Sequence, residues 1–332
     1  MFKLLKKLKE DKVFRTWMQL AGSVLAGTAI IAFIVSSSIN NNHVDSKYVS
    51  QTSSIAQEHN EKVDELVASD KLIKDPVYYE TVEPQSGFSL TVINVGQGLS
   101  CLVECDGETL LFDGGDRDTS SFLYSYIYNT RQIDYFNYVI ASHYDSDHIA
   151  GLIGILKNYK VGCVMGPPYE ADTNTYRSFA SAAQTKGGIV YPIVGDTFNV
   201  GSAKCTVVCP SIIDLSADEN SLCLGIRITY GNTSYLLMGD ATIEEELSCL
   251  DMLEPTDVYI VNHHGSSYSN SPELIEKVCP QISIISVGEN DYGHPGNDVI
   301  GRLFNSIIYR TDLNGTIILE SDGESIDIYT ER

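Results

Sequence analysis

The 332-residue sequence predicts an α/β protein, an αββα sandwich in which two β-sheets pack face to face with helices outside, preceded by one N-terminal transmembrane helix. Three observations lead to this prediction. Strand-like and helix-like segments alternate in two successive halves after residue 87. Residues 16–42 contain no charged side chain. Several strand-like segments end in histidine or aspartate, as expected where strands deliver functional side chains to the edge of a sheet.

The N-terminal segment has the pattern of a membrane anchor. Residues 1–16 form a basic tail with six Lys or Arg residues against two acidic ones. Residues 17–39 are mostly aliphatic, and a transmembrane helix needs about 20 such residues. The positive-inside rule keeps the tail cytoplasmic and places the rest of the chain outside the cell membrane. A cleaved signal peptide is the alternative, but the apolar run is long for one and no A-x-A site is obvious.

Residues 40–86 are polar and are expected to form a stalk or linker before a folded domain at 87–332. Beyond the anchor, 16 basic residues stand against 42 acidic ones, so the net charge there is −26. Such a surface repels polyanions and shows no basic stripe, which disfavours tight binding of nucleic acid. The eight cysteines lie in apolar segments without a CxxC pair, so we expect most of them to be buried and none to form a zinc ribbon.

The folded domain divides into strands, turns and helices. In its first half we expect strands at 88–95, 100–105, 109–112, 138–141 and 161–165, and helices near 120–130, 149–158 and 174–185. In its second half we expect strands near 221–230, 234–238, 257–261, 282–287, 316–320 and 325–329, and helices near 243–250, 272–278 and 298–306. Cys205 and Cys209 lie within a further apparent strand. Two halves of this kind favour two sheets with helices on their outer faces.

Residues 143–148 (HYDSDH) are the most informative stretch of the chain. Four side chains that bind metals occur within six residues, directly after an apolar run at 138–141. In an extended segment alternate side chains point the same way, so His143, Asp145 and Asp147 can converge. An Asp-rich helix N-terminus is the alternative, and it explains an aspartate but not the two flanking histidines. The stretch therefore predicts a site for a divalent cation.

Six short motifs occur in order, each at a predicted strand end. They are residues 94–98 (NVGQG), 110–115 (LLFDGG), 142–148 (SHYDSDH), 237–240 (LMGD), 263–266 (HHGS), and 286–288 (SVG) followed by 292–295 (YGHP). With these motifs the chain resembles the metallo-β-lactamase superfamily, and within it the ComEC-like branch, from about residue 90 to 328. As in that branch, Asp145 replaces the second histidine of the common HxHxDH signature. Leu99 and Ser100 stand where the branch usually has an acidic residue.

The resemblance implies two divalent metal ions with histidine and aspartate ligands. The expected ligands are His143, Asp145 and His263 for one ion, Asp147, His148 and His294 for the other, and Asp240 between the two. Because no thiolate is included, zinc is the first expectation, and manganese and iron also fit. Adjacent side chains at a strand end point in opposite directions, so we expect His263 at the metal and His264 in a second layer or at the substrate.

Around this centre we expect Asp147, His264 and His294 to be the catalytic side chains. Further residues are expected in a second layer or at the substrate: Asp113, Asn220, Ser266, Asn290 and Tyr292. Asp113 either orients a motif histidine or belongs to a plain Asp-Gly turn. Asn220 lies near the place where other superfamily members carry a further histidine. Ser266 is a candidate donor to a phosphate oxygen.

These features imply a membrane-anchored, extracytoplasmic hydrolase that uses a hydroxide bridging two metal ions, above all a phosphodiesterase. The family suggests a nuclease acting on DNA. The charge of −26 instead favours a smaller ester, such as a wall-polymer or phosphorylcholine-type phosphodiester. A lactone or β-lactam hydrolase on the same fold and a non-catalytic surface binding module are the alternatives.

Overall fold

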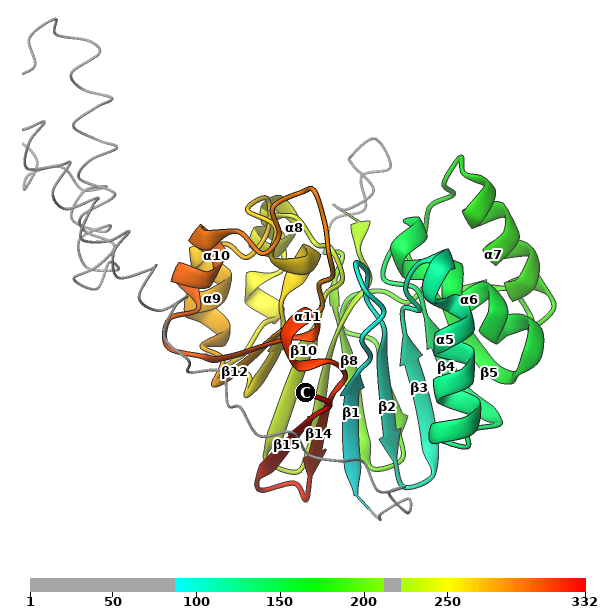
Figure 1. The fold of residues 1–332 in the computed structure, drawn as a ribbon, viewed down its shortest axis with the longest axis horizontal. Coiled ribbons are helices and arrows are strands. Elements are labelled where there is room, and N and C mark those ends of the chain that lie inside the picture. The colour runs from blue at the N-terminus through cyan, green and yellow to red at the C-terminus, as the bar shows by residue number, and fades with distance from the viewer. Residues whose placement is uncertain (1–86, 212–221) are drawn as a thin grey trace, which may run out of the picture. The chain divides into compact units, whose positions relative to one another are not determined.

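The computed structural model describes residues 87–211 and 222–332, which form two β-sheets with helices outside them (Figure 1). The predicted tail, transmembrane helix and stalk at 1–86 lie outside the described residues. Within the described ranges, no helix combines the length and apolar character needed to span a bilayer.

The first sheet has eight strands in the order β15-β14-β1-β2-β3-β4-β5-β6. Its strands are β1 (Phe88–Val92), β2 (Cys101–Cys105), β3 (Glu108–Phe112), β4 (Tyr135–Ile140), β5 (Lys160–Met165), β6 (Ile189–Val190), β14 (Ile317–Ser321) and β15 (Ile326–Thr330). Strands β3 to β6 run parallel to one another, whereas the remaining pairs are antiparallel. The loops after β3 and β4 therefore leave from the same edge of this sheet.

The second sheet has seven strands in the order β13-β12-β11-β10-β9-β8-β7. Its strands are β7 (Thr197–Val200), β8 (Ala203–Cys209), β9 (Gly225–Tyr230), β10 (Thr233–Leu237), β11 (Val258–Ile260), β12 (Ile282–Ile285) and β13 (Ile307–Arg310). Strands β10 to β13 are parallel. The sequence did not predict β6, β7 or β13, because these edge strands are short and partly exposed and so lack a clear apolar pattern.

Helices cover the outer face of each sheet. The first sheet carries α5 (Ser120–Ser125), α6 (Ser146–Asn158) and α7 (Asn174–Gln184), and the second carries α8 (Ile243–Ser248), α9 (Pro272–Val278) and α10 (Asn297–Arg302) (Figure 1). A short α11 (Thr311–Asn314) follows β13. The helix expected at 120–130 ends at Ser125 and continues as a π-helical turn, η2 (Tyr126–Thr130).

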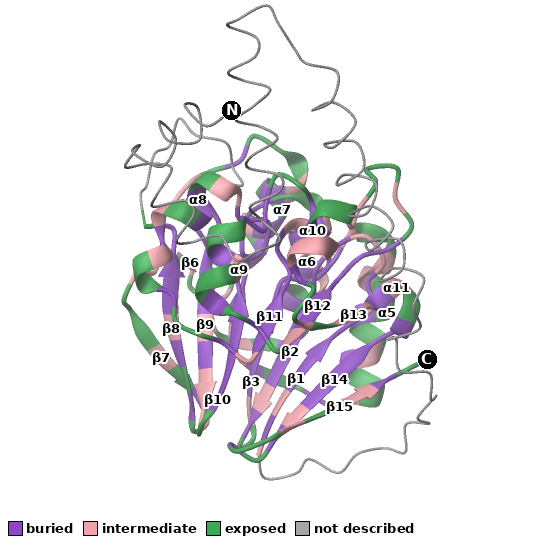
Figure 2. Cartoon of the chain, turned by 90° about the vertical axis from the view of Figure 1, so that its left-hand side faces the viewer, coloured by how far each residue is buried: buried purple, intermediate pink, exposed green. Residues whose placement is uncertain are grey.

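Three apolar layers hold these elements together, and the strands are buried on both faces (Figure 2). Leu110 and Phe112 point into the core between the sheets, whereas Leu111 packs under α5–α7. In the second sheet Leu237 points into the same core and Leu236 packs under the other helices. Because successive side chains of a strand point to opposite faces, this alternation confirms the predicted αββα sandwich.

A candidate metal centre between the two sheets

The candidate ligands lie in loops that follow parallel strands of both sheets. The loop after β4 carries His143 and Asp145, and the first turn of α6 adds Asp147 and His148. Asp240 follows β10, the pair His263 and His264 follows β11, and His294 lies in the loop after β12. Clefts beyond the carboxyl ends of parallel strands are common ligand sites in α/β proteins.

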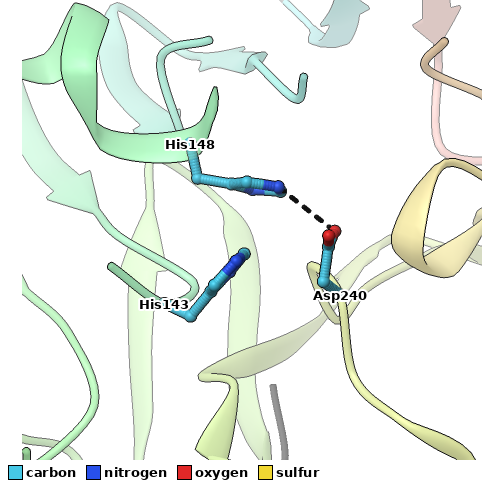
Figure 3. A group of neighbouring side chains, drawn as sticks. All are labelled: His143, His148 and Asp240. Atoms are coloured by element: carbon cyan, nitrogen blue, oxygen red, sulfur yellow. Dashed lines mark ion pairs between the residues drawn. The ribbon is translucent and has the colours of Figure 1, made fainter. Parts of the chain in front are cut away.

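His143, His148 and Asp240 point toward one another across the gap between the sheets (Figure 3). Both imidazoles are fully buried, with ring centroids 4.1 Å apart. The His148 Nε2 atom lies 3.2 Å from Asp240 Oδ1. One nitrogen or oxygen from each of the three residues falls within 4.8 Å of the others, the spacing of ligands around one ion.

A second group shares His148 and consists of Asp147, His148 and His264. The His264 Nε2 atom lies 3.4 Å from Asp147 Oδ2 and 3.6 Å from Asp240 Oδ2. Burial raises the pKa of Asp147, but the nearby charges of His148 and His264 outweigh it and lower the pKa to about 2. The carboxylate is therefore ionised at neutral pH, as a metal ligand must be.

A buried hydrogen-bond network lies behind this cluster. Asp113 is fully buried and accepts hydrogen bonds from Ser142 N (2.7 Å), Ser142 Oγ (2.6 Å) and His148 Nδ1 (2.8 Å). Burial lowers the pKa of His148, but the carboxylates of Asp240 and Asp113 raise it well above the usual range. Asp113 thus orients the His148 ring, and it also occupies a left-handed turn with φ 59°.

The two adjacent histidines both face Asp240. The Nε2 atoms of His263 and His264 each lie 3.6 Å from Asp240 Oδ2. The expectation that only one of them faces the site rested on extended backbone, whereas the structure gives them left-handed φ values of 53° and 54°. His264 Nδ1 donates to the carbonyl of Ser286 at 2.7 Å, which leaves its Nε2 free for a ligand.

His294 lies beside His263, although it was expected beside Asp147 and His148. Its ring centroid is 5.7 Å from that of His263. The Asn290 side chain donates to His294 O at 3.0 Å and accepts from His294 N at 3.0 Å, so the loop holds the histidine in place. The position next to Asp147 is taken by His264 instead.

Asp145 occupies the N-cap position of α6, but its side chain makes no capping hydrogen bond. The carboxylate is 51% exposed and lies 3.6 Å from His143 Nε2. The neighbouring His143 imidazole lowers the pKa of Asp145. Asp145 therefore stands at a helix N-cap, but capping does not explain why its carboxylate points toward His143.

A cleft of about 880 Å³ is lined by Asp145, Asp147, Asp240, His263, His264 and His294. The fully buried His143 and His148 are not among its lining residues. Asn290 and Tyr292 line it, as expected from the sequence. Ser266 does not, because it is buried in its loop, where its N–H donates to His263 O and its Oγ accepts from Tyr268 N. Asn220 lies outside the described residues.

Several residues of the site were not singled out from the sequence, among them Asp116, Glu289 and Asp291, which line the cleft. Ser142 contacts Asp113 and lies 3.0 Å from His143 Nδ1, and Gln97 lines the cleft. Both belong to motifs that the sequence displays, so a role for them was open to prediction. Glu246 accepts hydrogen bonds from Asn262, Asn270 and Ser271 in the loop that carries His263 and His264. The sequence gave no signal for it, because a glutamate within a helix usually faces solvent.

Five buried atoms of the cluster have no hydrogen-bond partner within the described chain. They are His143 Nε2, His148 Nε2, His264 Nε2, Asp240 Oδ1 and His294 Nδ1. Leaving a buried polar atom unpaired costs about 1–3 kcal/mol. Their convergence in one cleft fits residues that bind divalent cations through nitrogen and oxygen.

Comparison with known proteins gives a family and several relatives. A family model described as the metallo-β-lactamase superfamily matches residues 93–289. The chain is 28% identical over 251 residues to Recombination protein 2 of Haemophilus influenzae, covering 74% of this chain and 30% of that protein. It is 31% identical over 185 residues to ComE operon protein 3 of Bacillus subtilis, covering 54% of this chain and 24% of that protein. It is 26% identical over 248 residues to Competence protein ComA of Neisseria gonorrhoeae, covering 72% of this chain and 33% of that protein. The chain thus spans about a third or less of the length of these relatives.

Proposed function

Since the chain belongs to the metallo-β-lactamase superfamily and to its ComEC-like branch, we propose that it is a metal-dependent phosphodiesterase that acts at this cleft. The observation that carries the proposal is the set of buried, unpaired nitrogen and oxygen atoms of the candidate ligands. An eroded, purely structural version of the fold has no reason to keep such atoms together, because each of them is costly without a bound ion.

The candidate ligands suit two divalent ions. In our proposal His143 and Asp145 contribute to one ion and Asp147 and His264 to the other, while His148 and Asp240 lie close to both groups. Further contacts are proposed for His263, beside Asp240, and for His294. Zinc suits this nitrogen and oxygen set, and manganese or iron also fits it.

Two such ions, when bound, activate water as a nucleophile and stabilise the charge that develops on a phosphoryl group. The protein's own contribution is orientation. Asp113 and the Ser286 carbonyl accept from the Nδ1 atoms of His148 and His264, which directs their Nε2 atoms toward Asp240 and Asp147. Burial lowers the pKa of His294, so its imidazole is neutral at pH 7, as a histidine that binds a metal must be.

The test combines metal content with hydrolysis. The full chain is loaded with zinc, manganese or iron, its metal is measured by mass spectrometry, and bis(p-nitrophenyl) phosphate is the substrate. We expect about two ions per chain and hydrolysis that falls at least 100-fold in Asp240→Asn and His148→Ala. Unchanged metal content and hydrolysis in both variants would refute the proposal.

We also propose that residues 17–39 anchor the protein in the cell membrane with the catalytic domain outside. The uncharged segment and the basic flank before it support this. Sedimentation with membranes, together with digestion of the catalytic domain by protease added to intact cells, is the expected result. Recovery of the intact protein in the cytosol contradicts it.

DNA is a second candidate substrate, because two relatives are named as a competence protein and a recombination protein. The net charge of −22 opposes tight binding of a polyanion. The affinity for single-stranded DNA, measured at rising salt concentration, distinguishes DNA from a smaller phosphodiester as the substrate. A DNA-binding protein loses affinity steeply as salt rises. A flat, weak response favours a smaller phosphodiester.

A further inference from the structure

The cleft carries more carboxylates than the candidate ligands supply. Besides Asp145, Asp147 and Asp240, it is lined by Asp116, Glu289 and Asp291. We call these last three residues the outer carboxylates. None of the described residues that line the cleft is Lys or Arg, and within the described chain no outer carboxylate takes part in an ion pair.

Bound metal does not neutralise the outer carboxylates. Two divalent ions carry four positive charges, which the inner aspartates and one hydroxide from water balance. The outer carboxylates are left with no positive partner among the described lining residues. A second phosphate of a polyanion would therefore meet negative charge at this end of the cleft, which costs binding energy.

An aromatic ring lies among these charges. Tyr292 follows Asp291 directly and is 76% exposed, with its ring centroid 5.7 Å from that of His294. Its backbone N–H donates to Asn290 Oδ1 at 3.1 Å, which ties the tyrosine to the residue that also holds His294. An exposed tyrosine face beside carboxylates is the chemistry that recognises organic cations.

The outer carboxylates share the cleft with buried residues of the candidate metal centre. Asp240 and His264 are each only 4% exposed, and Asp240 Oδ1 and His264 Nε2 have no hydrogen-bond partner. Both residues line the same cleft as the outer carboxylates and Tyr292. The cleft therefore combines a place for the phosphoryl group with an acidic, aromatic rim.

We propose that the substrate is a phosphodiester with an organic ammonium group, which Asp116, Glu289, Asp291 and Tyr292 bind at the rim of the cleft. This inference rests on the proposed function and adds the chemical class of the substrate. It also gives a local reason, beyond the overall charge of the chain, why a polyanion is a poor substrate.

The experiment compares two diesters of the same shape on the full-length, metal-loaded protein. One is p-nitrophenyl phosphocholine. The other is p-nitrophenyl 3,3-dimethylbutyl phosphate, in which carbon replaces the charged nitrogen. We expect kcat/KM to be about tenfold higher for the choline ester, from the sum of a cation–π contact and exposed charge pairs. Because exposed charges are screened, the ratio should fall in 0.5 M salt.

Variants assign that preference to the rim. Asp291→Asn and Tyr292→Leu should bring the ratio of the two kcat/KM values toward one. Glu276→Gln, an exposed change on α9 outside the cleft, should leave the ratio as it is in the parent protein. A ratio near one in the parent protein, or a high ratio that survives both rim variants, overturns the proposal.

Two further substrates complete the test. The ethanolamine ester distinguishes the kind of ammonium group: a preference for choline over ethanolamine points to the Tyr292 face, and the reverse points to the carboxylates, while either supports a cationic substrate. Bis(p-nitrophenyl) phosphate separates the two proposals. If it is hydrolysed but the ratio is one, only the cationic substrate is refuted, and if no diester is hydrolysed with any of the three metals, both proposals fall.

Discussion

Three histidines reach the cleft with one ring nitrogen already engaged. His143 Nδ1 lies 3.0 Å from Ser142 Oγ, His148 Nδ1 bonds to Asp113, and His264 Nδ1 bonds to a backbone carbonyl. In each ring the Nε2 atom is buried without a partner. These contacts hold the rings in one orientation before any ion binds, which reduces the cost of ordering them on binding.

The buried carboxyl group of Glu245 makes the stability of the protein depend on pH. Its side chain is buried, and among residues 87–211 and 222–332 its Oε1 atom has no hydrogen-bond partner while its Oε2 atom accepts only from Cys223 N at 3.2 Å. Burial raises the pKa of Glu245 well above its usual value. A carboxyl of this kind stabilises the fold below its unfolded pKa of about 4.3, and that contribution is lost as pH rises through the folded value.

We therefore expect the free energy of unfolding of the parent protein to fall relative to Glu245→Gln between about pH 4.5 and pH 8. Gln keeps an oxygen for Cys223 N and never ionises. Urea unfolding at four pH values measures the difference, with the exposed neighbour Glu244→Gln as control. A difference that does not change with pH contradicts the prediction.

At the scale of elements, α6 packs directly on the turn that holds Asp113. Gly114 N donates to His148 O at 2.7 Å, and Gly151 N donates to Gly115 O at 3.1 Å. A Cβ atom on Gly151 would lie 1.9 Å from Gly114 O, so only glycine allows this approach. The contact sets the distance between Asp113 and His148.

Gly151→Ala should therefore destabilise the fold by about 1–3 kcal/mol, since backbone atoms must move. Gly154 lies in the same helix, and a Cβ there would meet nothing within 4 Å. Gly154→Ala should instead stabilise by about 0.5–1 kcal/mol, because alanine is the better helix former. Urea denaturation of both variants measures this, and equal effects would show that the close approach does not matter.

Helix α8 follows the loop that carries Asp240, and it is hydrogen-bonded to the loop that carries His263 and His264. Glu246 is fully buried and accepts hydrogen bonds from Asn270 N (2.6 Å), Ser271 N (2.7 Å) and Asn262 Nδ2 (2.8 Å). Each left-handed residue in that loop, His263 and His264, costs about 1–3 kcal/mol. The network around Glu246 offsets this strain and keeps both imidazoles near Asp240.

Glu246→Gln should lower metal affinity about tenfold, because one carboxylate oxygen becomes an NH₂ group that faces N–H donors. Competition with a coloured chelator measures the affinity. Glu244→Gln, two residues earlier on the exposed face of the same helix, should bind metal as the parent does. Equal affinities in the two variants would show that the network does not position the histidines.

At the scale of the whole described domain, the candidate ligands come from both sheets. His143 and His148 follow a strand of the first sheet, whereas Asp240 and His264 follow strands of the second. An ion held by His148 and Asp240, which lie close to both groups, would link the two halves across their shared core. Since it binds only the folded arrangement, it stabilises the protein by about 2.7 kcal/mol when its free concentration is 100 times Kd.

Removal of metal should therefore lower the Tm of the protein by about 5–10 °C, at 2–4 °C per kcal/mol for a domain of this size. Scanning calorimetry with and without chelator gives the shift. Asp240→Asn, which loses a carboxylate next to both groups, should show a much smaller response to chelator. If the Tm of the parent protein is the same with and without chelator, a metal shared by the two sheets is contradicted.

The sequence determined the α/β class, the packing of two sheets with helices outside and most elements, because their apolar periodicity reflects burial on both faces of each strand. It did not predict the strand order, in which β14 and β15 from the end of the chain join β1 in the first sheet. Leu110, Leu111 and Phe112 show how a continuous apolar run marks such a strand. The edge strands β6, β7 and β13 escaped prediction, since a partly exposed edge needs no such run. The motif residues were also identifiable from sequence alone, because their side chains have few other uses at strand ends.

Only the tertiary structure decided which of these residues meet. His264, and not His294, stands beside Asp147, because left-handed backbone after β11 turns both neighbouring histidines toward Asp240. The hydrogen bonds of Glu246 with its loop join residues 24 and 25 positions apart. Such contacts depend on how loops from two sheets pack against each other, and residue spacing along one chain does not encode that packing.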